Sequence, residues 1–293
     1  MRKSLFFFSS CFTILFSGNY FSFAAVMPPV KVMTYNIRYE NSYDTGSISW
    51  ASRKEFIRST ILFHQADIIG MQEVLHSQLS YFDSSLTGFA HVGVGREDGK
   101  EKGEYAPIFF RTQFFERLQD STFWLSTTPD RVSKGWDAAL ERICTWVKLK
   151  DRRTGQLFFV FNTHFDHIGV KARVESAHLL MLEMKRIAGN SPVVLTGDFN
   201  TDENTEPISI LRGKSGTQEY ALKDASDISK MPHHGSEKTF CGFNLHDGVI
   251  GNRIDYIFVS GHFSVLTHAT LTDFKGDHFP SDHFPVFSEI RLN

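Results

Sequence analysis

The stretch VVLTGDFN, at residues 193–200, sets two polar side chains directly behind a short apolar run. Its first four residues predict a strand that is buried on both faces. Asp198 and Asn200 follow one residue apart, so a carboxylate and a carboxamide leave the same strand end, where they can hold a metal, a water and a phosphate oxygen together. A plain Asp-x-Asn turn gives the same pattern, so the chemical interpretation depends on what the other strands carry.

Three other predicted strands border polar side chains in the same way. These are Glu73 behind residues 67–71, His164 behind residues 157–163, and Asp282-His283 ahead of residues 286–292. A glutamate at the end of a buried strand is costly unless it is paired or binds a cation, and Mg²⁺ takes one or two carboxylates together with waters and substrate phosphate. A histidine can donate to a phosphoryl oxygen or help to activate water.

His283 needs a carboxylate on its other ring nitrogen to fix its tautomer. That carboxylate can be distant in sequence, and Asp255, within RIDYIF at residues 253–258, is our candidate. His164 lies in NTHFDH at residues 162–167, which alone resembles a zinc cluster. The single-residue gaps and the strand context argue against zinc.

The order of the predicted elements favours two packed sheets with helices outside over a doubly wound parallel sheet, because strands outnumber helices and do not alternate with them strictly. Strands are predicted at residues 31–37, 67–71, 91–95, 107–111, 114–124, 143–149, 157–163, 193–196, 254–259, 263–267 and 286–292. Helices are predicted at residues 53–64, 78–86, 170–187 and 207–211, the first with Phe56, Ile57, Ile61 and Leu62 on its apolar side. No internal repeat is visible.

Six motifs in this order resemble those of the endonuclease/exonuclease/phosphatase superfamily, which includes deoxyribonucleases, nocturnin-like deadenylases, sphingomyelinases and inositol polyphosphate 5-phosphatases. They are MTYNIR around Asn36, the Gln-Glu pair at Glu73, residues 162–164, GDFN at 197–200, RIDYIF at 253–258 and SDH at 281–283. The resemblance covers residues 32 to 293 and implies a four-layer α/β sandwich: two mixed β-sheets packed face to face, with helices on both outer sides.

The resemblance also implies roles. The metal ligands would be Glu73, Asn36 and Asp282, for Mg²⁺ with Mn²⁺ as a substitute. The catalytic residues would be His164, Asp198, Asn200, Asp255 and His283. The phosphate or substrate would be bound by Asn36, Arg142, His164 and Asn200. In these roles Asp198 deprotonates the attacking water, and His283, oriented by Asp255, stabilises the transition state.

Two features depart from the pattern of particular branches. Arg38 stands where some nucleases carry an acidic residue, which favours a single Mg²⁺, and the Trp-Cys-Asp-Arg core of the 5-phosphatases is absent. Residues 93–105 resemble a subgroup that consists largely of secreted bacterial proteins. Glu104, within this stretch, either lines the cleft or caps a hairpin. Trp124, which follows later in the chain, is expected to pack in the core or against a loop.

The first 24 residues read as a signal peptide, with Arg2 and Lys3 ahead of an apolar stretch and a small-x-small site ending at Ala24. We therefore expect residues 25–293 to form the enzyme domain, secreted or periplasmic, monomeric and without a membrane anchor after cleavage. Removing two positive charges takes the formal charge from −2 to −4, which argues against tight nonspecific polyanion binding. Cys144 and Cys241 are interpreted as structural, whether paired or not.

The sequence therefore predicts a Mg²⁺-dependent phosphoesterase that acts by metal-assisted attack of water on a phosphate ester. A nuclease-type activity on nucleic acid ranks first. A phospholipid or sphingomyelin phosphodiesterase and a small-molecule phosphatase are the alternatives within this class. A non-catalytic binding module or a secreted effector is the alternative from another class.

Overall fold

A computed structural model describes residues 27–214, 221–243 and 251–293, and in these residues the chain forms two six-stranded sheets. The first sheet has the order β11 (Phe263–Thr270), β12 (Val286–Leu292), β1 (Val30–Asn36), β2 (Ile68–Gln72), β4 (Ile108–Arg111) and β3 (Phe89–Val92). The second has the order β5 (Phe115–Trp124), β6 (Ile143–Asp151), β7 (Leu157–His164), β8 (Val193–Asp198), β10 (Asp255–Val259) and β9 (Lys223–Asp224).

Each sheet is mixed. In the first, β1 and β2 run parallel, and in the second β7 and β8 do. The other pairs of neighbouring strands are antiparallel. The parallel pairs lie in the middle of the sheets, where strands are covered on both faces and read as continuous apolar runs.

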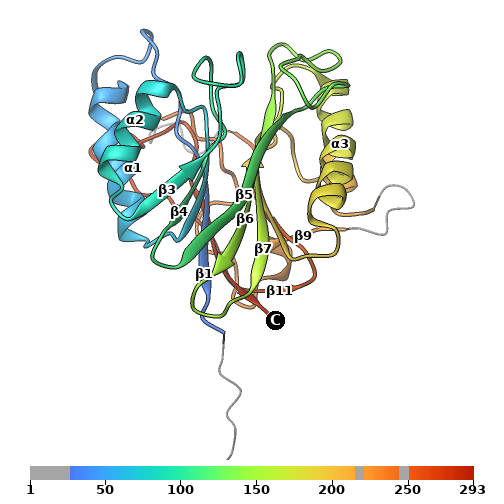
Figure 1. Ribbon diagram of the computed structural model, residues 1–293. Helices are drawn as coiled ribbons and strands as arrows, with labels where there is room; N and C mark the ends of the chain where they lie inside the picture. Colours follow the sequence, from blue (N-terminus) through green and yellow to red (C-terminus); the bar gives the residue numbers. More distant parts are fainter. Residues whose placement is uncertain (1–26, 215–220, 244–250) are drawn as a thin grey trace, which may run out of the picture.

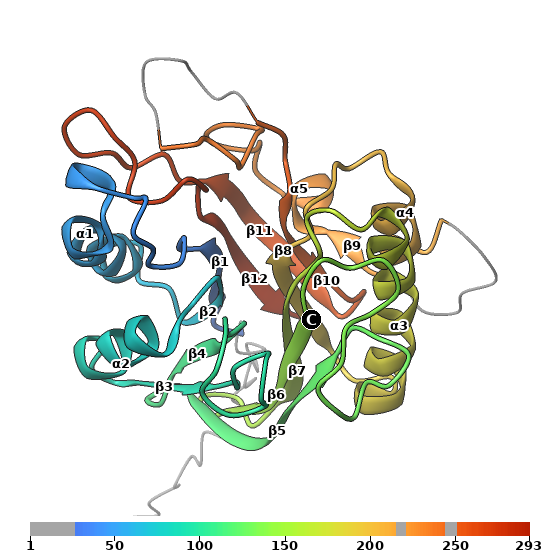
Figure 2. The same ribbon diagram turned by 90° about the horizontal axis from the view of Figure 1, so that it is seen from above.

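The sheets pack face to face and helices cover their outer faces, as Figures 1 and 2 show. Helices α1 (Trp50–Phe63) and α2 (His76–Ser85) lie on the first sheet, and α3 (Val170–Ala188) and α4 (Glu206–Leu211) on the second. A short α5 (Ala225–Ile228) contacts β10 and β11, and a 3₁₀ turn (Gly46–Ile48) precedes α1. The four-layer sandwich with two mixed sheets is confirmed.

Alternation along each strand builds the three apolar layers. In β1, Val32 joins the core between the sheets, whereas Met33 faces α1 and α2. In β8, Val194 faces the other sheet and Leu195 faces α3. Because these strands are buried on both faces, their polar side chains stand mainly at the strand ends.

One buried polar network joins the two sheets. Asn162 on β7 donates to the carbonyls of Met71 (2.7 Å) and Pro107 (3.0 Å), and its Oδ1 accepts from Gln72 Nε2 at 2.7 Å. Thr196 Oγ1 donates to the same Oδ1 at 3.0 Å. The Asn162 motif therefore has a structural part: it fixes the sheets against each other at the end where the polar side chains gather.

Most of the predicted elements are found within a few residues of their predicted bounds. The strand predicted at 91–95 is wrong at its end, because β3 stops at Val92 and Gly93 turns at φ 133°. The buried side of α1 is also wider than predicted, since it includes Arg53, whose guanidinium donates to the carbonyls of Ile37 and Pro280. The short elements β9 and α5 were not predicted.

Three further predictions concern the cysteines and the N-terminus. Cys144 and Cys241 are both buried and unpaired, so the packing role holds without a disulfide. The predicted signal peptide, residues 1–24, lies outside the described residues. Across the described part of the chain, none of the helices combines the length and the apolar character that crossing a bilayer requires.

Candidate active site

Strand register brings the polar residues to one edge of both sheets. In the second sheet Asp198 at the end of β8 lies opposite His164 on β7 and Asp255 on β10. In the first sheet Asn36 at the end of β1 lies opposite Gln72, and Glu73 follows it. The sheets face each other, so their ends form a single site.

A cleft of about 490 Å³ opens at this edge. Seven of the residues proposed from the sequence line it: Glu73, Arg142, His164, Asp198, Asn200, Asp282 and His283. Asn36 and Asp255 are fully buried and do not line the cleft themselves. The structure therefore brings the whole proposed set together, seven at the cleft surface and two as buried groups that contact them.

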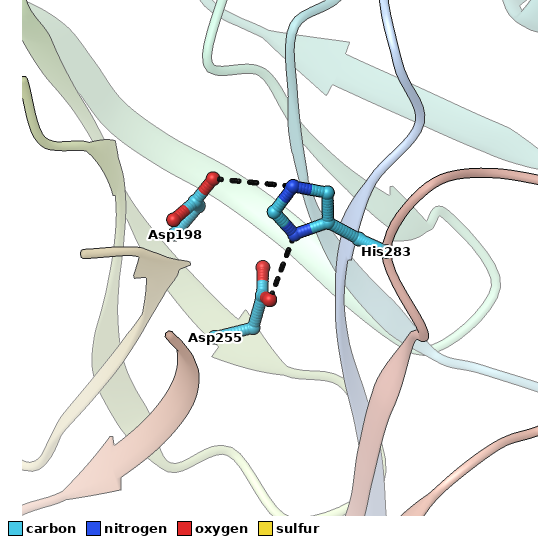
Figure 3. A group of neighbouring side chains, drawn as sticks. All are labelled: Asp198, Asp255 and His283. Atoms are coloured by element: carbon cyan, nitrogen blue, oxygen red, sulfur yellow. Dashed lines mark hydrogen bonds and ion pairs between the residues drawn. The ribbon is translucent and has the colours of Figure 1, made fainter. Parts of the chain in front are cut away.

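His283 lies between two carboxylates, as Figure 3 shows. Its Nδ1 is 2.9 Å from Asp255 Oδ2, and its Nε2 is 3.8 Å from Asp198 Oδ2. Burial lowers the pKa of His283, but the charges of Asp255 and Asp198 outweigh burial and raise that pKa well above its ordinary 6.5. The imidazole is therefore held as a cation, with Nε2 directed at the cleft.

Asp198 combines burial with the properties of a base. Burial and the nearby Asp255 carboxylate raise its pKa from 3.8 to about 7. Its Oδ1 accepts from the backbone N–H of Asn200 at 2.9 Å, and its Oδ2 accepts from Asn36 Nδ2 at 2.9 Å. A carboxylate that titrates near neutral pH and is held by two donors is suited to take a proton from water.

The candidate metal ligands form the other side of the cleft. Glu73 accepts from Asn36 Nδ2 at 3.1 Å and from the backbone N–H of Tyr39 at 3.1 Å, and its own backbone has φ 61°. Burial raises the pKa of Asp282, whose Oδ2 lies 3.5 Å from Arg38 NH1. The amide nitrogen of Asn36 faces Glu73 and Asp198, and its Oδ1 accepts from the backbone N–H of Arg38, so it positions both carboxylates.

A third group of polar side chains, Asn200, His164 and Arg142, lines the same cleft. Asn200 Nδ2 lies 3.1 Å from His164 Nε2, and burial together with Arg142 and Arg96 keeps the pKa of His164 well below 6.5, so the ring is neutral. Arg142 is almost fully buried, with Nε 3.2 Å from Asp166 and NH2 2.9 Å from His167. The guanidinium is thus fixed at the cleft wall.

Several contacts of the site were missed in the sequence. Thr239 Oγ1 accepts from the backbone N–H of Asp255 at 3.1 Å, and the Phe240 ring lies 5.2 Å from His283, edge to face. Both residues belong to an irregular segment, so no periodicity marks them. The buried position of Arg53 could have been predicted, because Arg53 precedes Ile57 by four residues and so lies on the same apolar side of the helix. A cation buried there requires hydrogen-bond acceptors.

Two face-to-face sheets that present carboxylates, amides and imidazoles at one edge form a site with the groups that hydrolysis of a phosphoester bond requires. The chain belongs to the endonuclease/exonuclease/phosphatase family, whose model matches residues 33–283. Its enzyme class, a hydrolase acting on phosphoester bonds, is thereby confirmed.

Two solved structures from Bacteroides thetaiotaomicron resemble the chain over most of its length. A family protein is 39% identical with a TM-score of 0.85, covering 91% of this chain and 99% of that one. A mannosyl-6-phosphatase is 39% identical with a TM-score of 0.84, covering 90% of this chain and 100% of that one. Nocturnin from Drosophila melanogaster is 27% identical, and the match spans 84% of this chain but 42% of that protein.

Proposed function

We propose that the protein hydrolyses phosphomonoesters of small hydroxylated molecules, such as hexose phosphates, with the help of one Mg²⁺ ion. The size of the cleft carries this proposal: about 490 Å³ suits a small molecule bound in a pocket. The similarity to the mannosyl-6-phosphatase over 90% of the chain supports the same substrate class. The formal charge of −2 gives no general attraction to a polyanion.

The residues at the cleft suit a hard divalent cation. Glu73 and Asp282 offer carboxylate oxygens, which Mg²⁺ prefers. Burial first, and then the neighbouring carboxylates Asp255 and Glu73, raise the pKa values of Asp198 and Asp282, and a bound cation would offset both effects. Arg38 lies 3.5 Å from Asp282 and already supplies one positive charge there, which favours a single cation over two. When bound, the cation would neutralise charge on the phosphate and lower the pKa of coordinated water.

The protein side chains divide the remaining work. Asp198 takes the proton of the attacking water, whose oxygen forms the new bond to phosphorus as the ester P–O bond breaks. Arg142, whose NH1 has no hydrogen-bond partner within the described part of the protein, donates to a non-bridging oxygen, and Asn200 and His164 contact the same phosphate. His283 adds positive charge where negative charge develops. The leaving alkoxide takes up a proton from water and Asp198 returns its proton to the solvent, so the products are inorganic phosphate and the free alcohol.

The nuclease activity ranked first from the sequence stays a prediction. The nocturnin match at 27% identity favours it, and it differs from our proposal in requiring a phosphodiester. The two are separated by a panel of mannose 6-phosphate, p-nitrophenyl phosphate, bis-p-nitrophenyl phosphate and single-stranded RNA, each with Mg²⁺, Mn²⁺ or excess EDTA. Phosphate release from the two monoesters, lost in EDTA, is the expected result. Cleavage of RNA alone would overturn the proposal.

A further inference from the structure

Residues 93–105 form a hairpin-like wall of the cleft that none of the catalytic steps uses. The backbone N–H of Arg96 donates to the carbonyl of Glu104 at 3.0 Å, and that of Glu97 donates to Lys102 at 3.1 Å. Trp124 fastens the wall from outside, because its indole N–H donates to the Arg96 carbonyl at 2.8 Å. The wall is therefore a rigid part of the site rather than a free loop.

Glu104 is the residue of this wall that lines the cleft, and it is paired with Arg96. Both guanidinium NH groups of Arg96 donate to the two oxygens of Glu104, each at 2.8 Å, with 7% and 15% of the two side chains exposed. A carboxylate accepts about four hydrogen bonds, so the pair leaves acceptor sites on Glu104. Glu104 lines the cleft, which resolves the choice left open by the sequence.

A carboxylate at this place is unfavourable for binding a second phosphate. Glu104 Oε2 lies 3.8 Å from His164 Nδ1, and the other nitrogen of that ring lies 3.4 Å from Asp198 Oδ2. The His164 ring therefore separates Glu104 from Asp198, next to which we place the reacting phosphate. The two guanidinium groups nearest to Glu104 are already paired, Arg96 with Glu104 itself and Arg142 with Asp166, and the acidic residues of the wall outnumber its basic ones. The wall therefore offers acceptors without net positive charge.

We propose that Glu104, held by Arg96, accepts hydrogen bonds from hydroxyl groups of the leaving alcohol and so selects phosphate esters of polyhydroxylated molecules. This inference rests on the proposed phosphomonoesterase function and adds a residue that determines its substrate. Hydroxyl groups next to the ester can donate hydrogen bonds to the carboxylate oxygens of Glu104. The phosphate of an adjoining nucleotide would instead face this carboxylate and be repelled.

The test compares two monoesters, one with hydroxyls and one without. kcat/KM is measured for mannose 6-phosphate and for p-nitrophenyl phosphate in wild type, Glu104→Gln and Glu104→Asp. Glu97→Gln is the matched control, because Glu97 lies on the same hairpin, pairs with Lys102 at 3.2 Å and does not line the cleft. Thermal unfolding of each variant verifies folding.

The expected result is a loss of about tenfold or more for mannose 6-phosphate in Glu104→Gln, the size of a charge-assisted hydrogen bond, with p-nitrophenyl phosphate changed less than threefold. An equal loss for both esters would overturn the inference, because Glu104 would then act through His164. No loss for either ester would overturn it as well. Wild-type protein inactive on both monoesters would refute the proposed function itself, which is a separate outcome from a wrong ratio.

Discussion

Replacing Asp255 by Asn tests the orientation and charge of His283. The two side chains meet at 2.9 Å and both are buried. Two unit charges at 2.9 Å interact by about 6 kcal/mol at an effective dielectric constant of 20, which is an upper limit for the loss. A charge-assisted hydrogen bond gives a lower limit of about 2–3 kcal/mol. We therefore expect kcat to fall by about 10²- to 10⁴-fold.

The same substitution has a second readout in the pH profile. Asp255 is one cause of the raised pKa of Asp198, so removing its charge lowers that pKa from about 7. Asp198 then stays ionised at lower pH, and the acid limb of the remaining activity moves to lower pH.

The assay is steady-state phosphate release between pH 5 and 9. Asp83→Asn is the control, since it breaks a similar pair with His91 (3.0 Å) on the surface. A loss below threefold, with an unmoved acid limb, would refute the role given to this pair.

Three further predictions concern stability and export. Gly70→Ala should destabilise the fold by about 3 kcal/mol or more in urea unfolding, because a Cβ at this position overlaps Thr196 Oγ1 between the sheets. Gly261→Ala is the control and should change stability little, because the space around Gly261 is open. Equal urea midpoints for the two variants would contradict this prediction. Burial lowers the pKa of His268 from 6.5 to about 3, so the unfolded chain binds a proton at this residue before the folded protein does. The free energy of unfolding is therefore unaffected above pH 6.5 and falls as the pH drops toward 3, by about 2 kcal/mol at pH 5. A His268→Leu variant with the same pH dependence of stability would refute this prediction. We propose that export removes residues 1–24, so the intact mass of secreted protein should begin near Ala25, and a mass that retains the whole N-terminus would exclude this cleavage.

Most strands and helices could be predicted from local sequence patterns. Apolar runs such as residues 193–196 predict strands because a strand buried on both faces needs apolar side chains at every position. The two-residue β9 and the four-residue α5 are too short to show a period, so tertiary contacts alone define them. The end of β3 depends on the positive φ of Gly93, which a single sequence does not reveal.

The candidate site was predictable to the extent that its residues stand at strand ends. Glu73, His164 and Asp198 do, and strand pairing then carries them to one edge. The pairing of Glu104 with Arg96 depends on hairpin register across eight residues. The contact of Phe240 with His283 joins two irregular segments, and no period in sequence records such a contact.

We propose above that the carboxylates of this cleft hold a divalent cation for the hydrolysis of a phosphate ester. The most direct measurement is a Mg²⁺ titration of phosphate release from mannose 6-phosphate by wild type and by Glu73→Gln, with excess EDTA as the zero point. We expect saturable activation of the wild type, no activity in EDTA, and a variant that needs at least about tenfold more Mg²⁺ or stays inactive. Equal rates for both proteins, unchanged by EDTA, would contradict it.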